Sequence, residues 1–216
     1  MKIAIMQPYF APYLGYFQLI EESDIFVFYD DVNFITRGWI NRNIIDIPTN
    51  INHYRFTIPL IKASQNKKIN ELDVNWDCKE MSKLLKTFEY SFKNKPIASG
   101  IIEKIISMKP KTISDMAILS IKLICSELDI NTQFKRSSQL EYIKHNDKAL
   151  NLIEICKLHN ATTYINPIGG QELYSKEEFS KYGVSLQFLK GYHSTSLLNI
   201  IDTLTTKNKL YNYECI

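Results

Sequence analysis

A polar segment behind a predicted strand carries residue types that can handle a charged small molecule. Asp30 and Asp31 close a strand predicted over 24–29, and adjacent strand residues face opposite ways, so at most one carboxylate points into a site. Such a carboxylate can pair with an amino group or act as a general base. Further along, Arg37 and Arg42 can bind phosphate, and Trp39 can stack on a ring. Asn41 and Asn43 are suited to sugar hydroxyls. The alternative is a solvated hairpin in which Trp39 packs and Asp30 caps a turn.

The loop after the first predicted strand, over 2–6, is unusually rich in hydrogen-bonding groups. It contains Gln7 and three tyrosines, Tyr9, Tyr13 and Tyr16. Loops carried by parallel strands are where α/β proteins hold their sites. A helix predicted from Gly15 onward would present free N–H groups to an anion such as phosphate. The structural alternative is that proline and tyrosine only shape and pack a tight turn.

A third segment runs from a strand predicted over 163–165 into a Gly-Gly turn. Asn166 precedes the pair Gly169 and Gly170, and Tyr174 follows it. Glycines allow a backbone to approach a ligand closely, although an ordinary strand-to-helix turn explains the pattern equally well. A weaker candidate, Ser137 and Ser138, follows a strand predicted over 132–134.

The elements that must position these segments alternate between strands and helices. Further strands are predicted over 54–58 and 184–189, and helices over 15–22, 79–92, 97–108, 114–128 (with Ser114 as its cap), 147–158, 177–182 and 196–205. This alternation predicts an α/β fold with a mostly parallel sheet. We expect a single domain, residues 1–216, with a helical insert at about 79–128.

Composition narrows the class of protein. The chain has 216 residues, of which 45% are hydrophobic, and a formal charge of +3. Neither the charge nor its distribution indicates nucleic-acid binding, and no run approaches the ~20 apolar residues of a membrane span. Since no signal peptide is recognisable, we expect a cytoplasmic protein with no membrane partner. The histidines, including His193, and the four cysteines lack metal-ligand spacing, so no metal site is expected.

The first loop also resembles a known fold. Nucleotidyltransferases of the adenylyltransferase and pantothenate-synthetase kind follow their first strand with proline and then H-x-G-H, which opens a helix. Here the corresponding run is Tyr13-Leu14-Gly15-Tyr16, so both histidines are tyrosines. The resemblance implies a three-layer, nucleotidyltransferase-like (Rossmann-like) architecture. Neutral phenols cannot replace the imidazoles that contact ATP phosphates, so it supports the architecture more than the activity.

Nearly the whole chain resembles the WbqC-like proteins, which are often encoded among genes for bacterial O-antigen or other surface polysaccharides. The resemblance rests on IAIMQPYFAPYLGYFQLI, FYDDVNFITRGWINRN, the Ser137-Ser138 pair, YINPIGGQELY and NIIDTL. Residues 61–130 carry little of the family pattern. The end departs from it, because the Asn and Gly that tend to follow the family's L-S-I-I-D run are missing here.

The resemblance implies an enzyme of O-antigen or lipopolysaccharide biosynthesis acting on a nucleotide-linked amino or deoxy sugar. We expect a transferase that moves an acyl or aminoacyl group to the sugar amine, with Asp30 or Asp31 facing the amine and Gln7 or N–H groups near Gly169 stabilising the oxyanion. An acyl-carrier protein is a candidate donor. Two alternatives are nucleotidyl transfer or ATP-dependent ligation, and a noncatalytic sugar-nucleotide binding protein. The sugar, the nucleotide, the transferred group and the oligomeric state stay open.

Overall fold

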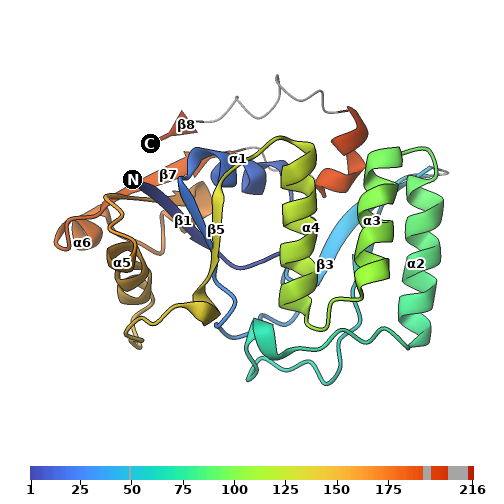
Figure 1. Ribbon diagram of the computed structural model, residues 1–216, viewed down its shortest axis with the longest axis horizontal. Helices are drawn as coiled ribbons and strands as arrows, with labels where there is room; N and C mark the ends of the chain where they lie inside the picture. The colour runs from blue at the N-terminus through green and yellow to red at the C-terminus, as the bar shows by residue number, and fades with distance from the viewer. Residues whose placement is uncertain (49, 192–195, 204–213) are drawn as a thin grey trace.

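A mostly parallel sheet forms the centre of the protein in the computed structural model, which describes residues 1–48, 50–191, 196–203 and 214–216. Within those residues the sheet has six strands in the order β5-β2-β1-β6-β7-β8 (Figure 1). The first five in that order are parallel, and β8 pairs antiparallel with β7. Their bounds are β1 (Lys2–Met6), β2 (Ile25–Phe28), β5 (Gln133–Arg136), β6 (Thr163–Pro167), β7 (Ser185–Lys190) and β8 (Glu214–Cys215).

Helices cover both faces of the sheet and make three layers. On one face α1 (Leu14–Glu22) shares a core cluster with Ala4 and Phe26 of the sheet, and its Tyr16 ring lies 5.3 Å from the Phe26 ring, centroid to centroid. On the other face α5 (Lys148–Leu158) and α6 (Lys176–Ser180) belong to a second cluster, which includes Val27 of β2. Because both faces are covered, β1 and β2 are short, continuous apolar runs rather than alternating ones. The α/β, three-layer, Rossmann-like architecture that the sequence predicts is confirmed.

Three helices extend the layer that contains α1. They are α2 (Lys79–Phe92), α3 (Pro96–Met108) and α4 (Ile113–Glu127), and they stand beside one another at one end of the molecule (Figure 1). A hairpin of β3 (Arg42–Ile47) and β4 (Asn50–Thr57) packs against them, with Phe56 meeting Phe88 edge-on at 5.0 Å between ring centroids. The strand β4 was predicted, whereas β3 was read as part of a polar loop. The division into one domain with an insert stays a prediction.

Two predicted helix features are wrong in detail. The cap of α4 is Thr112, which accepts from the backbone N–H of Asp115, and Ser114 lies inside the first turn. The last predicted helix, over 196–205, is replaced in its described part by two 3₁₀ turns, η4 (Leu197–Asn199) and η5 (Ile201–Thr203). Its polar side chains are used elsewhere: Asn199 bonds the backbone of β3, and Asp202 accepts from two N–H groups of α3. Such side-chain bonds compete with a regular helix. Residues 204–205 and His193 lie outside the described residues.

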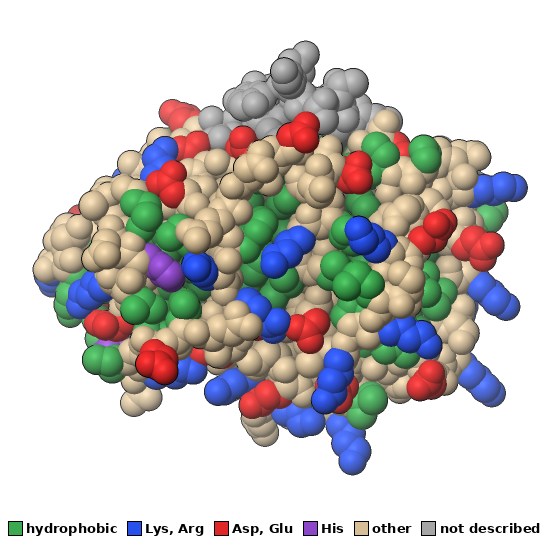
Figure 2. All heavy atoms as spheres, in the orientation of Figure 1, with side chains coloured by type: hydrophobic (Ala, Val, Ile, Leu, Met, Phe, Trp, Pro, Cys, Tyr) green, Lys and Arg blue, Asp and Glu red, His purple; other side chains and the backbone are tan. Residues whose placement is uncertain are grey.

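The surface in Figure 2 mixes charge of both signs. Acidic and basic side chains alternate over the insert helices, with apolar groups between them. In the described part of the chain, no helix is both long enough and apolar enough to cross a bilayer.

Candidate functional site

A cleft opens where the sheet changes its winding direction. From β1 the chain passes through α1 to β2 on one side, and from β6 it passes through α6 to β7 on the other. The carboxyl ends of β1 and β6 therefore flank a topological switch point, where ligands bind in open α/β sheets. A cleft of about 650 Å³ lies there. Its lining includes residues at the ends of three strands, namely Met6 of β1 and Gln7 after it, Tyr29 after β2, and Asn166 and Pro167 of β6.

The lining combines aromatic rings with side-chain amides. Among the described residues it holds five tyrosines, four amides and one charged side chain: Tyr9, Tyr13, Tyr29, Tyr164 and Tyr174; Gln7, Asn33, Asn151 and Asn166; and Lys148. Tyrosine offers a flat apolar face and a hydroxyl, and amides both donate and accept. This lining suits a ligand with a ring and several hydroxyl or carbonyl groups better than a purely apolar or a highly charged one.

The loop after β1, which forms one wall of the cleft, is fixed by groups from distant segments. The Asn43 amide donates to the backbone oxygens of Phe10 (3.0 Å) and Ala11 (2.6 Å). The N–H of Ala11 donates to Ser120 Oγ of α4 (2.9 Å), and Ser196 Oγ donates to Ala11 O (2.8 Å). These bonds satisfy buried backbone groups that a tight turn cannot pair internally. The wall is therefore rigid, and Asn43 belongs to its support.

The tyrosines of this loop divide into two roles. Tyr13 lines the cleft, whereas Tyr16 is fully buried in the core and donates its hydroxyl to Gln7 O at 3.0 Å. Burial raises the pKa of Tyr16 well above its ordinary value, so the phenol stays neutral. Of the two residues that replace the histidines of the nucleotidyltransferase pattern, only Tyr13 faces the cleft.

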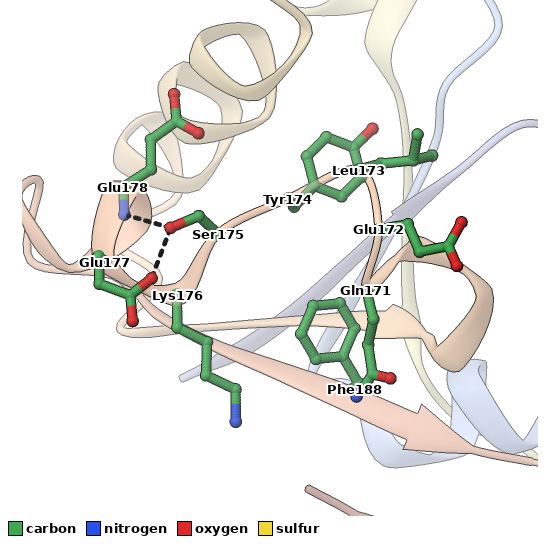
Figure 3. Close-up of a pocket in the computed structure, with 9 residues that line it drawn as sticks. All are labelled: Gln171, Glu172, Leu173, Tyr174, Ser175, Lys176, Glu177, Glu178 and Phe188. Atoms are coloured by element: carbon green, nitrogen blue, oxygen red, sulfur yellow. Dashed lines mark hydrogen bonds between the residues drawn. The ribbon is translucent and has the colours of Figure 1, made fainter.

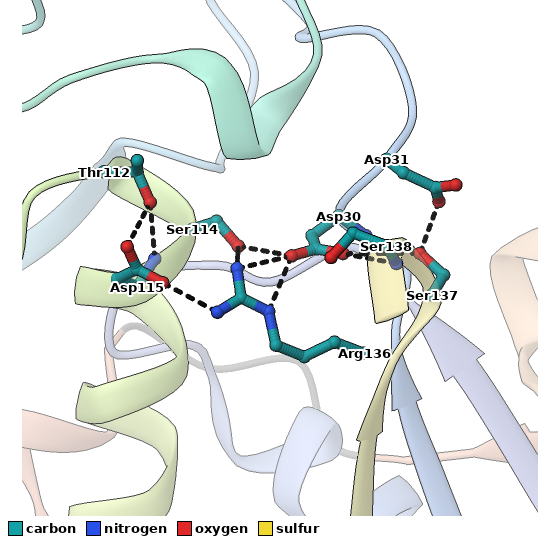
Figure 4. A network of polar contacts seen from close by, with 8 residues as sticks. All are labelled: Asp30, Asp31, Thr112, Ser114, Asp115, Arg136, Ser137 and Ser138. Atoms are coloured by element: carbon teal, nitrogen blue, oxygen red, sulfur yellow. Dashed lines mark hydrogen bonds and ion pairs between the residues drawn. The ribbon is translucent and has the colours of Figure 1, made fainter. Parts of the chain in front are cut away.

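A network of carboxylates, hydroxyls and cations lies at the same edge of the sheet (Figure 4). Asp30 is fully buried, and its Oδ2 accepts from Arg136 Nε (2.8 Å), Arg136 Nη2 (2.7 Å) and Ser114 Oγ (2.9 Å). Its Oδ1 accepts from the N–H of Ser138 at 3.1 Å. Arg136 also donates from Nη1 to Asp115 of α4 at 2.7 Å. Both oxygens of Asp30 are thus engaged, which favours a positioning role.

Asp31 has a separate set of partners. Its carboxylate accepts from Ser137 Oγ, from the Tyr142 hydroxyl (3.1 Å) and from Lys144 Nζ. Burial raises the pKa of Asp31, but the hydrogen bonds from Lys144 and Ser137, the Lys144 charge and the bond from Tyr142 outweigh burial, and the pKa lies below its ordinary value. Asp31 is therefore an ionised anchor for Tyr142 and Lys144. Ser137 links the two aspartates, since its Oγ donates to the carboxylate of Asp31 and accepts from the backbone N–H of Asp30 at 3.0 Å.

The lowered pKa of Asp31 predicts a pH dependence of stability. A carboxyl whose folded pKa lies below its unfolded pKa of about 4 contributes stability that is complete above about pH 5 and is lost as pH falls through the folded pKa. The free energy of unfolding, measured with denaturant from pH 7 to pH 2, should therefore fall less steeply at acid pH for Asp31→Asn than for the wild type. The same substitution at exposed Asp77 should leave the pH dependence unchanged, and equal slopes for wild type and Asp31→Asn would contradict the assignment.

The structure brings some predicted site residues into the cleft and leaves others outside its lining. Seven lie in the cleft: Gln7, Tyr9, Tyr13, Asn166, Gly169, Gly170 and Tyr174. Asp30, Asp31, Ser137 and Ser138 belong to the neighbouring network. Arg37, Trp39, Asn41, Arg42 and Asn43 are outside the lining. Asn41 donates to Ile58 O at 2.9 Å, and Trp39 lies under the guanidinium of Arg55 at 5.8 Å.

Several residues of the site have no site role in the sequence analysis, although Tyr29, Asn33 and Tyr164 lie inside the quoted motifs and Ser114 was predicted as a helix cap. They are Tyr29, Asn33, Lys148, Asn151 and Tyr164 in the cleft, and Ser114, Asp115, Arg136, Tyr142 and Lys144 in the network. Tyr29 directly precedes the two aspartates at a strand end, and this position alone indicates that its side chain can line a site. For Lys148, Asn151, Asp115, Tyr142 and Lys144 no local pattern marks the residue, because each meets its partners only through the fold. Across the described residues, no group of three or more His, Cys, Asp or Glu side chains is placed to hold a metal ion.

A second, more open pocket of about 550 Å³ adjoins the cleft (Figure 3). Leu173 and Tyr174 line both, so the segment after Gly170 separates them. The second pocket is bordered by Glu177, whose carboxylate accepts from Ser175 Oγ at 2.6 Å, and by Glu178. With Glu172, the lining holds, among the described residues, three carboxylates against one cation, Lys176, which makes this pocket a poor site for a diphosphate.

Comparison with family models identifies one family. The family model of the WbqC-like protein family matches residues 7–205. The chain is also similar to the uncharacterized protein Rv1507c of Mycobacterium tuberculosis (strain ATCC 25618 / H37Rv), at 25% identity over 187 residues, covering 85% of this chain and 79% of that protein. No solved structure matches.

Proposed function

We propose that this chain, which belongs to the WbqC-like protein family, transfers an acyl or aminoacyl group to the amine of a nucleotide-linked sugar destined for a bacterial surface polysaccharide. The observation that carries the proposal is the tyrosine- and amide-lined cleft at the switch point of the sheet. Its volume of about 650 Å³ is within the usual range for small-molecule sites.

Each part of such a substrate has a counterpart in the cleft. The tyrosine rings offer faces to the base and the sugar, and the amides offer partners to the sugar hydroxyls. Lys148, the first residue of α5 and the one cation among the described lining residues, is suited to the diphosphate. This assigns to Lys148 the contact first expected from Arg37 and Arg42.

The proposed reaction is a simple acyl transfer. The sugar amine attacks the carbonyl carbon of an activated acyl donor such as a thioester, a C–N bond forms, and the carbonyl π electrons move to oxygen. Collapse of this intermediate breaks the C–S bond, and the departing thiolate takes the proton that the amine loses. The fold supplies orientation and hydrogen bonds aimed at the developing charge, which are large contributions in acyl transfer.

The ATP-dependent alternative has less support from the site. It needs phosphate contacts at the Tyr13–Tyr16 run, and the Tyr16 hydroxyl is committed to Gln7 O inside the core. A noncatalytic binding protein would use the same cleft, and differs only in lacking turnover.

A thermal-unfolding screen tests the proposal. A ligand at 100 times its Kd stabilises the folded state by about 2.7 kcal/mol, so a bound nucleotide-sugar should raise Tm by roughly 5–10 °C. The panel is UDP- and dTDP-linked amino sugars, the matching hydroxyl sugars, and ATP with Mg²⁺. Stabilisation by an amino sugar, followed by N-acylation with an acyl thioester detected by mass spectrometry, is the expected result.

Variants locate the binding in the cleft. Lys148→Ala should remove most of the shift, whereas Lys157→Ala, at the other end of the same helix and paired with Glu154, should keep it. A shift with ATP alone would favour the nucleotidyl-transfer alternative. Binding without any acylated product would favour the noncatalytic one.

A further inference from the structure

Asn166 is a polar residue that is almost completely buried and still lines the cleft. It is 8% exposed and lies near the end of β6. Its Oδ1 accepts from the hydroxyl of Tyr164, which is itself 1% exposed, at 3.3 Å. In the described part of the chain, no acceptor meets its Nδ2. The amide is thus held by its oxygen and presents its N–H₂ group.

A glycine makes room for this orientation. A Cβ placed on Gly170 would lie 1.9 Å from Asn166 Nδ2, whereas a Cβ on the neighbouring Gly169 would meet nothing within 4 Å. Neither glycine has a positive φ, so backbone strain does not explain them. Gly170 is therefore required for the position of one side-chain amide, and Gly169 is not.

The chemistry of this position selects the kind of group that binds there. The Tyr164 hydroxyl lies within hydrogen-bond distance of Asn166 Oδ1 (3.3 Å) and of Ile5 O (3.5 Å), and the group that Asn166 presents to the cleft is its Nδ2 donor. A hydroxyl or amine can accept this bond, but it needs a further acceptor for its own proton. A carbonyl oxygen, which only accepts, pairs fully.

We infer that Asn166 Nδ2 binds the acyl carbonyl oxygen of the group transferred to the sugar, an inference that rests on the proposed function. When the amine attacks, this oxygen becomes the oxyanion, and the same N–H stabilises it more strongly than it binds the neutral carbonyl. Asn166 then takes the role first expected from Gln7 or from N–H groups near Gly169. Tyr164 and Gly170 are positioning residues.

Calorimetry with matched ligands on the full chain tests the inference. The probes are pairs of UDP- and dTDP-linked sugars that differ only in a free amine or an N-acetyl group. Asn166→Asp keeps the shape and the bond from Tyr164 but replaces the N–H₂ donor by a carboxyl oxygen. Gly170→Ala adds no charge and so separates loss of the donor from the effect of a carboxylate. Asn166→Asp should weaken binding of the N-acetyl member about tenfold, the value of one hydrogen bond, and spare the amine member.

The two glycines supply a second, independent test. Gly170→Ala should produce the same selective loss as Asn166→Asp, and Gly169→Ala should match the wild type. Tm of each variant shows whether it is folded; if Asn166→Asp does not fold, Gly170→Ala decides. Equal losses for both members of a pair, or no loss, would overturn the inference while leaving the proposed function intact. If the wild type binds no nucleotide-sugar, the proposed function fails and this inference falls with it.

Discussion

Replacing Arg136 by alanine is expected to destabilise the protein by about 3–5 kcal/mol, because it leaves the carboxylate of Asp30 buried without its counter-charge. Asp30 is fully buried, and Arg136 supplies two of the hydrogen bonds to its Oδ2. Denaturant unfolding measures the loss, which should also lower Tm by roughly 10 °C.

Two further variants separate this effect from a general sensitivity to losing arginine. Arg55→Ala removes an exposed guanidinium that lies over Trp39, and should cost less than about 1 kcal/mol. Combining Arg136→Ala with Asp30→Asn removes both charges, so the double variant should be more stable than Arg136→Ala alone. A loss for Arg136→Ala no larger than for Arg55→Ala would show that the pair does not hold the edge of the sheet.

The loss should also reach the helical insert. Arg136 contacts Asp115, and Asp30 contacts Ser114, so the first turn of α4 is tied to the sheet through these two residues (Figure 4). Hydrogen exchange at the start of α4 should therefore accelerate in Arg136→Ala before the rest of the helix is affected.

The second large effect is expected for Asn43→Asp, at more than about 2 kcal/mol. The substitution preserves the volume of the side chain but removes its N–H₂ group, and it points an oxygen at the backbone oxygens of Phe10 and Ala11. The carboxyl must either carry a buried charge beside two carbonyls or bind a proton to donate one bond. We therefore expect lower stability, measured by urea unfolding, together with weaker ligand binding.

An exposed asparagine is the matched control for this variant. Asn131 donates to Asp129 O at the surface, and Asn131→Asp should change stability by less than about 0.5 kcal/mol. If Asn43→Asp were as stable as Asn131→Asp, the hydrogen bonds from Asn43 to the loop after β1 would not contribute to stability.

The elements that the sequence predicted well are those with a strong apolar pattern. Continuous runs such as β2 and helical spacing such as that of α2 predict burial directly, and burial fixes their type. Strand β3, with the sequence RNIIDI, was missed because its polar residues resembled ligand-binding groups in a loop. Its partner strand β4 was found, so the error lay in the interpretation of Arg42 and Asn43.

The site was predicted less completely, because residue type alone does not tell which way a polar group faces. Asn41 and Asn43 are of the kind that binds sugars, yet their amides are used on backbone carbonyls. Arg136 meets Asp30 from 106 residues away, a pairing that no local pattern encodes. The first loop was recognised as a site because its proline and tyrosine content exceeded what a turn needs.

The hydrogen bonds that fix the loop after β1 also affect when the binding site can form during protein synthesis. The first strand and its loop leave the ribosome early, but Ala11 is bound by Ser120 and by Ser196, which lies 185 residues downstream. The opposite wall of the cleft, at β6, pairs with β1 across a similar separation. Such non-local contacts form late, after most of the chain has been ordered. A nascent chain that ends before residue 196 therefore contains the tyrosines of the cleft but lacks one of the bonds that fix its wall.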